Sequence, residues 1–317
     1  MEKRFEEILA RALRSRVSDI HFQLNDGCLS IDMRTIGGIV HLPQKEEDVR
    51  LFNYLQYLSH LDVSSRSPQT GSFTYFFRGR YYDFRLAVIT TLKSRDGVLR
   101  ILNCHDGLRL DQLTYDSEIH DLFRQIINLR SGLVIFSGLT GSGKTTTMYS
   151  LLNMITGRTI YSLEDPIEVY QDNIVQLQIS EKAGMDYAAA IKQILRHNPD
   201  VLMIGEIRDE KAAVMAVRAA LTGVLVFSSL HAANGSGAVR RLLDLGVKEN
   251  DLAEVIQYIF SQRLCRKRDE KQYTGIYDYL TGCQVRKIIA GERVESRMDE
   301  RLQAAVKAGI IEESVRG

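Results

Sequence analysis

The spacing of apolar residues divides the chain near residue 105. Before that point, residues 2–14 and 46–61 carry apolar side chains at helical intervals. Around them lie short alternating runs and stretches rich in aromatic and β-branched residues, which are typical of strands. These runs cover residues 19–24, 29–33, 38–42, 72–77, 80–90 and 97–102. The pattern predicts a small α+β domain over residues 1–105, built on an antiparallel sheet.

After a linker at 106–116, fully apolar runs alternate with helical patterns. Strands are predicted at 132–137, 158–163, 201–205 and 224–229, and helices at 117–129, 144–155, 186–196 and 209–221. Strands that are apolar throughout are typical of a parallel sheet covered on both faces, so we predict the α/β class. We expect this core domain over 117–235. A mostly helical C-terminal region follows over 236–317, interrupted by a strand at Tyr273–Leu280.

Composition and charge exclude only a few classes of protein. The 317 residues are 44% hydrophobic and 26% charged, with a formal net charge of +1. No global field therefore attracts nucleic acid or an acidic membrane, and we expect no direct nucleic-acid binding. The four cysteines are scattered without a Cys-x-x-Cys pair, which argues against a zinc ribbon or a disulfide framework. We see neither a signal-peptide pattern nor an apolar run of membrane-spanning length, and we expect a cytoplasmic protein.

A motif with a specific chemistry follows the first strand of the predicted core. Residues 138–145 read Gly-Leu-Thr-Gly-Ser-Gly-Lys-Thr and open a helical pattern. The glycines let backbone N–H groups turn toward phosphate oxygens, and the helix adds its positive N-terminus. Lys144 should reach the β- and γ-phosphates and Thr145 should hold Mg²⁺; the alternative is a glycine-rich turn. The predicted nucleotide-binding residues are Gly138, Leu139, Thr140, Gly141, Ser142, Gly143, Lys144, Thr145 and Thr146.

Acidic residues follow two further apolar strands of the core. Glu206 ends the Walker B pattern that begins at Val201, and Glu164, Asp165 and Glu168 follow the strand at 158–163. Because strand carboxyl ends line the ligand crevice of open α/β sheets, both clusters should lie near the phosphate loop. Hydrolysis needs an acid to support Mg²⁺ and a group to orient water. Acidic residues also cap helices and fill turns, and this alternative stays open for each of them.

A histidine follows a third apolar strand. His231 comes directly after Phe227-Ser-Ser-Leu, at what should be the same edge of the sheet. One interpretation is that it senses the γ-phosphate. The other is that it is a strand-end histidine whose hydrogen bonds are satisfied by its neighbours.

Taken together, these motifs resemble the secretion (traffic) ATPases of the type II secretion and type IV pilus superfamily. Four family signatures occur in order: Walker A at 138–145, the Asp box at 160–168, Walker B at 200–209 and the His box at 221–231. Further matches are Ser18-Asp-Ile-His21, Gln262-Arg-Leu264 and Gly275–Leu280. The resemblance covers nearly the whole chain. It implies a RecA-like P-loop core, a PAS-like N-terminal domain, and ATP hydrolysis with Mg²⁺.

The resemblance also implies roles for single residues. Glu168 matches the residue that activates water, and Glu206 matches the acid that supports Mg²⁺. Two arginines of the family's N-terminal domain lie fifteen residues apart and reach the nucleotide, and Arg85 and Arg100 match that spacing. A guanidinium can neutralise charge growing on the γ-phosphate; the alternative is a pair of strand arginines that face solvent. We expect Arg208 and Arg196 to be structural ion-pair partners.

Three departures from the family pattern narrow the subgroup. The His box reads Thr222-Gly223-Val224 where a histidine often stands in third place, so a mechanism that needs both histidines is in doubt. No four-cysteine insert follows Gln262-Arg-Leu264, and Cys283–Ile289 matches the signature of retraction motors poorly. A short chain without the insert and without the retraction signature most resembles the Gram-positive competence ATPases that drive DNA uptake (ComGA-like).

The resemblance further implies a hexameric ring that powers pseudopilus assembly through a polytopic inner-membrane platform protein. The ATPase would then be peripheral at the inner face of the membrane, docked through its partner. A retraction motor, an ATP-gated scaffold with little turnover and a DNA-translocating motor remain alternatives. The basic run Arg263–Lys271 is a candidate for contact with the membrane or the platform, unless it is a solvated loop.

Overall fold

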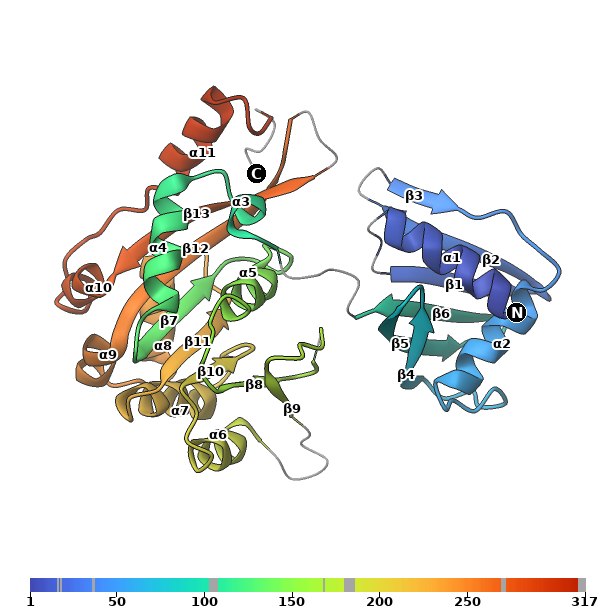
Figure 1. Ribbon diagram of the computed structural model, residues 1–317, viewed down its shortest axis with the longest axis horizontal. Helices are drawn as coiled ribbons and strands as arrows, with labels where there is room; N and C mark the ends of the chain where they lie inside the picture. The colour runs from blue at the N-terminus through green and yellow to red at the C-terminus, as the bar shows by residue number, and fades with distance from the viewer. Residues whose placement is uncertain are drawn as a thin grey trace. The chain divides into compact units, whose positions relative to one another are not determined.

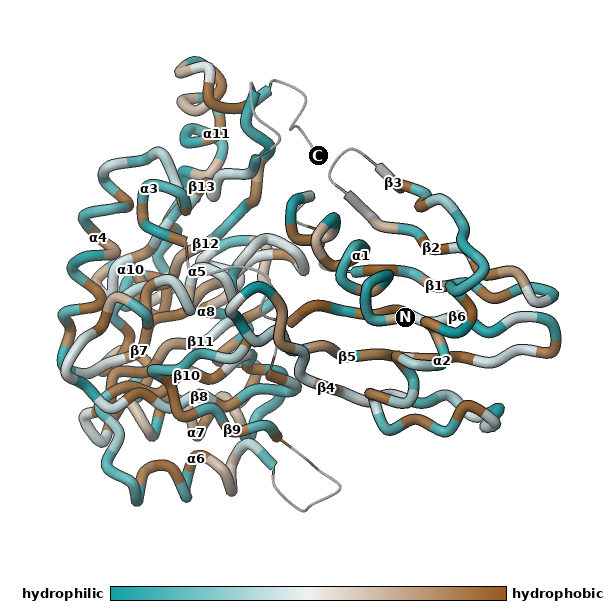
Figure 2. The backbone as a smooth tube through the Cα atoms, turned by 45° about the vertical axis from the view of Figure 1, so that its right-hand side comes forward, coloured by the Kyte–Doolittle hydropathy of each residue, from teal (hydrophilic) through white to brown (hydrophobic). Residues whose placement is uncertain are grey.

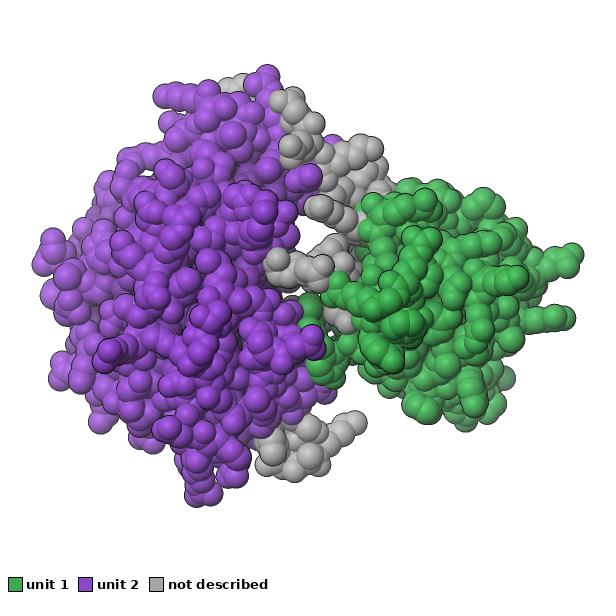
Figure 3. Space-filling model, viewed as in Figure 1, with its two compact units in different colours: residues 1–106, 168–170 green, residues 107–167, 171–317 purple. Residues whose placement is uncertain are grey.

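The computed structural model describes residues 1–15, 17, 19–35, 38–102, 108–167, 169–179, 186–268 and 272–312. The chain forms two compact units (Figure 3). Unit 1 comprises residues 1–106 with 168–170, and unit 2 comprises residues 107–167 with 171–317.

Unit 1 is an α+β unit with two helices and a six-stranded antiparallel sheet (Figure 1). The strand order is β3-β2-β1-β6-β5-β4. The strands are β1 (Asp19–Asn25), β2 (Cys28–Thr35), β3 (Gly38–His41), β4 (Gln69–Phe77), β5 (Arg80–Thr90) and β6 (Ser94–Ile101), and the helices are α1 (Glu2–Arg14) and α2 (Asp48–Leu58). Partly buried and exposed residues alternate along β4, and Ile20 and Phe22 of β1 are buried two residues apart, as the alternation of side chains along a strand requires.

The core of unit 1 lies between the helices and one face of this sheet. Phe5 of α1 packs edge-on against Phe84 of β5, and Phe52 of α2 stacks on Phe22 of β1 with ring centroids 5.4 Å apart. A Cβ on Gly97 of β6 would lie 2.5 Å from the Phe52 ring. Glycine at this position therefore lets α2 approach the sheet closely.

Unit 2 is built on a seven-stranded sheet in the order β13-β12-β7-β11-β10-β8-β9. All neighbouring pairs are parallel except β12 with β13. The strands are β7 (Gly132–Ser137), β8 (Ile160–Glu164), β9 (Val175–Gln178), β10 (Val201–Ile204), β11 (Leu225–Leu230), β12 (Ile256–Arg266) and β13 (Tyr273–Thr281). The helices are α3 (Leu110–Leu113), α4 (Ser117–Ile127), α5 (Lys144–Leu152), α6 (Tyr187–Leu195), α7 (Glu210–Leu221), α8 (Gly235–Asp244), α9 (Glu249–Val255), α10 (Gly282–Ile289) and α11 (Met298–Lys307).

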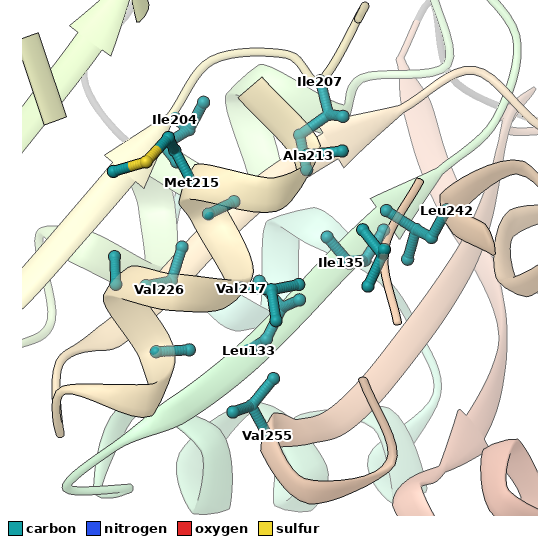
Figure 4. Close-up of a cluster of buried hydrophobic side chains, with 14 of the residues drawn as sticks. Leu133, Ile135, Ile204, Ile207, Ala213, Met215, Val217, Val226, Leu242 and Val255 are labelled. Carbon is teal, nitrogen blue, oxygen red and sulfur yellow. The ribbon is translucent and has the colours of Figure 1, made fainter. Parts of the chain in front are cut away.

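Helices cover both faces of this sheet, so β7, β10 and β11 are buried throughout and form apolar stretches inside the unit (Figure 2). On one face, Val217 of α7 lies in the same buried cluster as Leu133 of β7 (Figure 4). On the other face, Phe123 of α4 packs against Phe136 of β7 and Phe260 of β12. This double cover is the arrangement that fully apolar strands predict, and it confirms the α/β class.

The C-terminal part of the chain differs from the expected helical region with one strand. Residues 256–266 form β12, which pairs with β7 and lengthens the central sheet, and β13 follows as its antiparallel partner. The segment expected to be a linker, 106–116, contains the short helix α3. Pairing with β7 decides the β12 conformation, because it buries Ile259 and Phe260 on opposite faces of one sheet. None of the helices in the described ranges is long and apolar enough to cross a membrane.

Candidate nucleotide site

The predicted phosphate loop connects β7 to α5, and β12 lies close beside it. Gly138 and Gly143 have φ angles of 151° and 87°, which L side chains rarely adopt. A Cβ on Gly138 would lie 2.6 Å from the carbonyl oxygen of Gln262, and one on Gly143 would lie 3.0 Å from the Gln262 Nε2 atom. Both glycines are therefore required by conformation and by the close approach of β12.

The loop gathers polar groups that suit a polyphosphate. The Lys144 ammonium is buried and donates to the carbonyl oxygens of Gly138 and Leu139, each at 3.0 Å. The Ser142 hydroxyl is buried without a hydrogen-bond partner among the described residues. A buried hydroxyl without a partner costs free energy that a ligand oxygen would recover. The residues present therefore fit a phosphate group at the N-terminus of α5.

The acidic residues and His231 lie at the loop's edge of the sheet. Because β7, β8, β10 and β11 are parallel, their carboxyl ends share one edge. Glu206, with 21% of its side chain exposed, lies 3.1 Å from the His231 Nε2 atom and accepts a hydrogen bond from Arg208 Nε at 2.9 Å. Arg208 also donates to Asp165 at 3.3 Å. The hydrogen bond to Glu206 is the main cause that raises the pKa of Arg208.

Arg208 thus ties the Walker B strand end to the Asp box, as expected for a structural ion-pair partner. The other candidate, Arg196, donates instead to the amide of Gln193 at 3.4 Å. The interpretation of His231 as a phosphate sensor stays a prediction; the structure gives it Glu206 as a partner.

Glu164 lies in a buried hydrogen-bond network. Its side chain accepts hydrogen bonds from the Tyr149 hydroxyl, from Ser162 Oγ at 2.6 Å and from Gln176 Nε2 at 3.0 Å. These donors belong to α5, β8 and β9, so the carboxylate joins three elements. Of the two interpretations open for Glu164, this arrangement favours the structural one.

A tyrosine that the sequence did not single out faces the same acidic cluster. Burial raises the pKa of Tyr187 to about 12, and the carboxylates of Asp165 and Glu206 act in the same direction. Arg208 opposes them, because a nearby cation favours the phenolate. Tyr187 begins α6, and no local sequence signal relates that helix to the phosphate loop.

The remaining candidate residues are distributed as follows. Glu168 lies outside the described residues. Thr145 is partly exposed and Thr146 is exposed at the start of α5.

Arg85 and Arg100 belong to unit 1, where they stand directly opposite each other on β5 and β6. The spacing of fifteen residues is therefore the register of a hairpin. Arg100 is 59% exposed and pairs with Asp19 at 2.7 Å, and a role of either arginine at the nucleotide stays a prediction.

The departure at Val224 lies away from the phosphate edge. Val224 is buried in the apolar cluster of unit 2, and its carbonyl accepts from the N–H of Gly132 at the start of β7. Strand β11 separates it from His231, a distance of about 20 Å at the usual rise per residue. A valine here therefore removes no group from the edge that carries the loop.

One aromatic and basic cluster also escaped the sequence analysis. At the end of the β4–β5 hairpin, the Phe76 and Tyr81 rings lie 4.9 Å apart, and Arg78 and Arg80 lie over the Phe77 and Tyr82 rings. Residues 76–82 thus combine aromatic and basic side chains, a combination found in proteins that bind single-stranded nucleic acid. They form one short hairpin, and the net charge of +1 still gives no extended basic track.

A parallel sheet whose central strand leads through a glycine-rich loop into a helix, with acidic residues at neighbouring strand ends, defines a RecA-like P-loop protein. The chain belongs to the Type II/IV secretion system protein family, whose model matches residues 1–308. This finding agrees with the resemblance drawn from the motifs.

Individual relatives and structures extend this result. Competence protein ComGA of Bacillus subtilis (strain 168) is 33% identical over 311 residues, which cover 91% of this chain and 87% of ComGA. A crystal structure of the pilus retraction motor PilT with bound ADP is 27% identical, with a TM-score of 0.75 over 97% of this chain and 94% of that one. The Legionella pneumophila ATPase DotB shares the fold, with a TM-score of 0.81 at 22% identity over 98% and 93% of the two chains. The chain spans about half the length of the type II secretion E proteins and pilus assembly ATPases that it also matches.

Proposed function

We propose that the protein is an ATPase that works as a hexameric motor and powers assembly of a competence pseudopilus for DNA uptake. The observation that carries ATP binding is the phosphate loop, at the edge that also holds Glu206. The loop has a buried lysine and a buried serine hydroxyl that finds no partner in the described part of the chain. The match to ComGA over nearly the full length of both chains supports the competence role.

In this proposal, the loop N–H groups, Lys144 and Ser142 hold the phosphates of ATP. The Thr145 hydroxyl and the Glu206 carboxylate support Mg²⁺, which when bound neutralises charge on the β- and γ-phosphates. Arg208 and His231 hold Glu206 in place from two sides. Glu168 orients the attacking water. Arg85 and Arg100 supply positive charge to the γ-phosphate, as the family pattern implies.

Partners and location are part of the same proposal. The motor would act on a polytopic platform protein of the inner membrane and stay peripheral at its cytoplasmic face. The likeness to PilT supports retraction as the second candidate. A pilus retraction assay alongside a DNA-uptake assay separates the two, because a retraction motor is needed only after the filament exists. The replacement of a His-box histidine by Val224 leaves an ATP-gated scaffold with little turnover as a further alternative, but Val224 lies away from the phosphate edge.

Steady-state ATPase measurements on three variants test the activity. We expect Lys144→Ala to lose both binding and turnover, because the loop loses its cation. Glu168→Gln should lose turnover while it still binds ATP, because water is no longer activated. Glu249→Gln is the control, since Glu249 is exposed on α9, which leads into the opposite edge of the sheet. Undiminished turnover in Glu168→Gln would refute its assignment.

A further inference from the structure

Two motifs that the proposed function leaves without a role meet beneath the phosphate loop. Gln262-Arg-Leu264 lies on β12 and Gly275–Leu280 lies on β13, and their register sets Gln262 opposite Tyr277. The two side chains are buried, with 3% and 1% of their surface exposed. Both bond to Thr147 of α5, which is also fully buried.

The hydrogen bonds of this cluster have a definite direction. Thr147 Oγ1 lies 2.8 Å from the Tyr277 hydroxyl, 3.1 Å from Gln262 Oε1 and 3.1 Å from the carbonyl oxygen of Gly143. Burial raises the pKa of Tyr277 far above its usual range, so its phenol stays protonated. A threonine hydroxyl has one proton and accepts as well. Tyr277 therefore donates to Thr147, and Thr147 shares its single proton between the oxygens of Gln262 and Gly143.

This cluster fixes one end of the phosphate loop. The Gly143 carbonyl accepts from the Thr147 N–H at 3.0 Å as well as from its hydroxyl. The peptide that joins Gly143 to Lys144 is planar and trans, so its N–H points away from its carbonyl. With the carbonyl held toward the helix interior, the Lys144 N–H is directed out of the helix N-terminus, where phosphate binds.

Gln262 also borders the other end of the loop. Its carbonyl oxygen lies 2.6 Å from where a Cβ on Gly138 would be. Gly275 completes the arrangement, because a Cβ there would lie 2.6 Å from the Tyr277 ring. Any larger residue at 275 would displace the ring whose hydroxyl reaches Thr147.

We propose that Gln262, Thr147 and Tyr277 are positioning residues that hold the phosphate loop in its nucleotide-binding shape. The inference rests on the proposed function, since it assumes that the loop binds ATP. The three side chains act on the loop through the Gly143 carbonyl, and the backbone carbonyl of Gln262 borders Gly138. Two strands from the C-terminal part of the chain thereby line the phosphate loop.

Binding of ATP and of ADP, each with Mg²⁺, tests this assignment. We expect Tyr277→Phe to raise Kd about 3- to 10-fold, the effect of one lost hydrogen bond. Thr147→Val removes the hydroxyl that joins all three partners and should raise Kd at least as much. KM for ATP should rise by the same factor with kcat within about twofold, because the loop binds ground state and transition state alike. Thr147→Ser keeps the hydroxyl and should bind as the wild type does. Tyr279→Phe is the matched control, since its hydroxyl donates to Glu118 at 2.6 Å, away from the loop.

Three outcomes would overturn the proposal. The first is wild-type affinity in Tyr277→Phe, whatever its melting temperature. The second is an equal loss of affinity in Tyr279→Phe. The third is full additivity in the Tyr277→Phe/Thr147→Val double variant, because two members of one network should lose less together than the sum. Lys144→Ala is measured in the same assay. Wild-type affinity in Lys144→Ala would contradict the phosphate site itself, and not only the positioning role of Gln262, Thr147 and Tyr277.

Discussion

Glu164 and Glu206 follow neighbouring parallel strands, yet their surroundings separate their roles. Glu164 is 3% exposed and accepts hydrogen bonds from three side chains. Glu206 is partly exposed beside an arginine and a histidine that belong to the same edge. A carboxylate enclosed by donors has little capacity left for a metal or a water, whereas one held from the side keeps some. The sequence pattern alone does not separate them, because two of the donors to Glu164, Tyr149 and Gln176, come from other elements.

The buried network around Glu164 predicts a loss of stability. Glu164→Ala removes the buried carboxylate on which the donors of Tyr149, Ser162 and Gln176 converge, and we expect the free energy of unfolding to fall by about 2–4 kcal/mol. Chemical denaturation measures this change. Asp165→Ala is the control, because Asp165 is 47% exposed and its ion pair with Arg208 should contribute about 1 kcal/mol or less. An unchanged unfolding midpoint in Glu164→Ala, combined with lost turnover, would instead make Glu164 a catalytic residue.

At the scale of elements, the sequence predicts the central strands well because each is a single local pattern. The strand predicted at 132–137 is β7, and those predicted at 201–205 and 224–229 match β10 and β11 within one residue at each end. Strand β12 escaped prediction, because its apolar residues continue the pattern of α9 without a break. Only the pairing with β7, more than a hundred residues earlier, decides its conformation.

In the candidate site, too, the parts formed by one local sequence pattern are predictable and the parts formed by distant segments are not. The phosphate loop is contiguous, so eight residues are enough to predict it. Gln262 and Tyr187 approach the site from distant segments, and their contribution depends on the topology of the sheet. A sequence pattern therefore predicts the ligand class, whereas the groups that shape the loop become visible only in the folded chain.

Helix α11 carries a buried arginine in addition to its apolar contacts with β12 and β13. Arg301 is 8% exposed and bonds to Asp116 at 2.7 Å and to Glu118 at 3.1 Å, with its guanidinium 5.4 Å from the centre of the Tyr279 ring. Asp116 is the N-cap of α4. The arginine thus connects the last helix of the described chain to the first long helix of unit 2.

Arg301→Met should lower the free energy of unfolding by about 2–3 kcal/mol, because the carboxylates of Asp116 and Glu118 lose the cation that they share. Arg301→Lys should not restore it, since an ammonium cannot span both acids as a guanidinium does. The Tyr279 hydroxyl, followed by Arg301, lowers the pKa of Glu118. A lowered pKa gives stability that is present above the unfolded value of about 4.5 and is lost as pH falls. Chemical denaturation of the wild type and of Arg301→Met at pH 7 and near pH 3 measures both effects, and we expect the difference between the two proteins to shrink at the lower pH. Equal unfolding midpoints of the two proteins at pH 7 would contradict a stabilising role of Arg301.

At the scale of the whole molecule, unit 1 contains an arrangement that stability alone does not explain. Arg85 and Arg100 stand directly opposite each other on adjacent strands, where like charges are unfavourable, and one of them pairs with Asp19. Each can be exchanged for a β-branched residue without loss of core packing, because neither belongs to the apolar cluster of unit 1.

Arg85→Thr tests whether this pair is kept for function. We expect the melting temperature to stay the same or rise slightly, because the repulsion with Arg100 is removed. Turnover should nevertheless fall at least about tenfold, because the γ-phosphate loses a cation. Arg95→Thr, at the other end of β6, is the control and should leave turnover unchanged. Wild-type turnover in Arg85→Thr would leave the pair as two strand arginines that face solvent.

A hexameric motor makes a further prediction about the assembled molecule. One chain has a mass of 36.0 kDa, so native mass measurement with ATP and Mg²⁺ should give a species of about six times that value. Closed rings of identical subunits make turnover cooperative when hydrolysis in one subunit depends on its neighbours. Mixing wild-type chains with Glu168→Gln chains should therefore lower turnover more steeply than the fraction of wild type. The control mixture uses Glu249→Gln and should show no loss. A strict monomer under these conditions, together with a loss that is linear in the wild-type fraction, would contradict the ring and leave an ATPase that works as single chains.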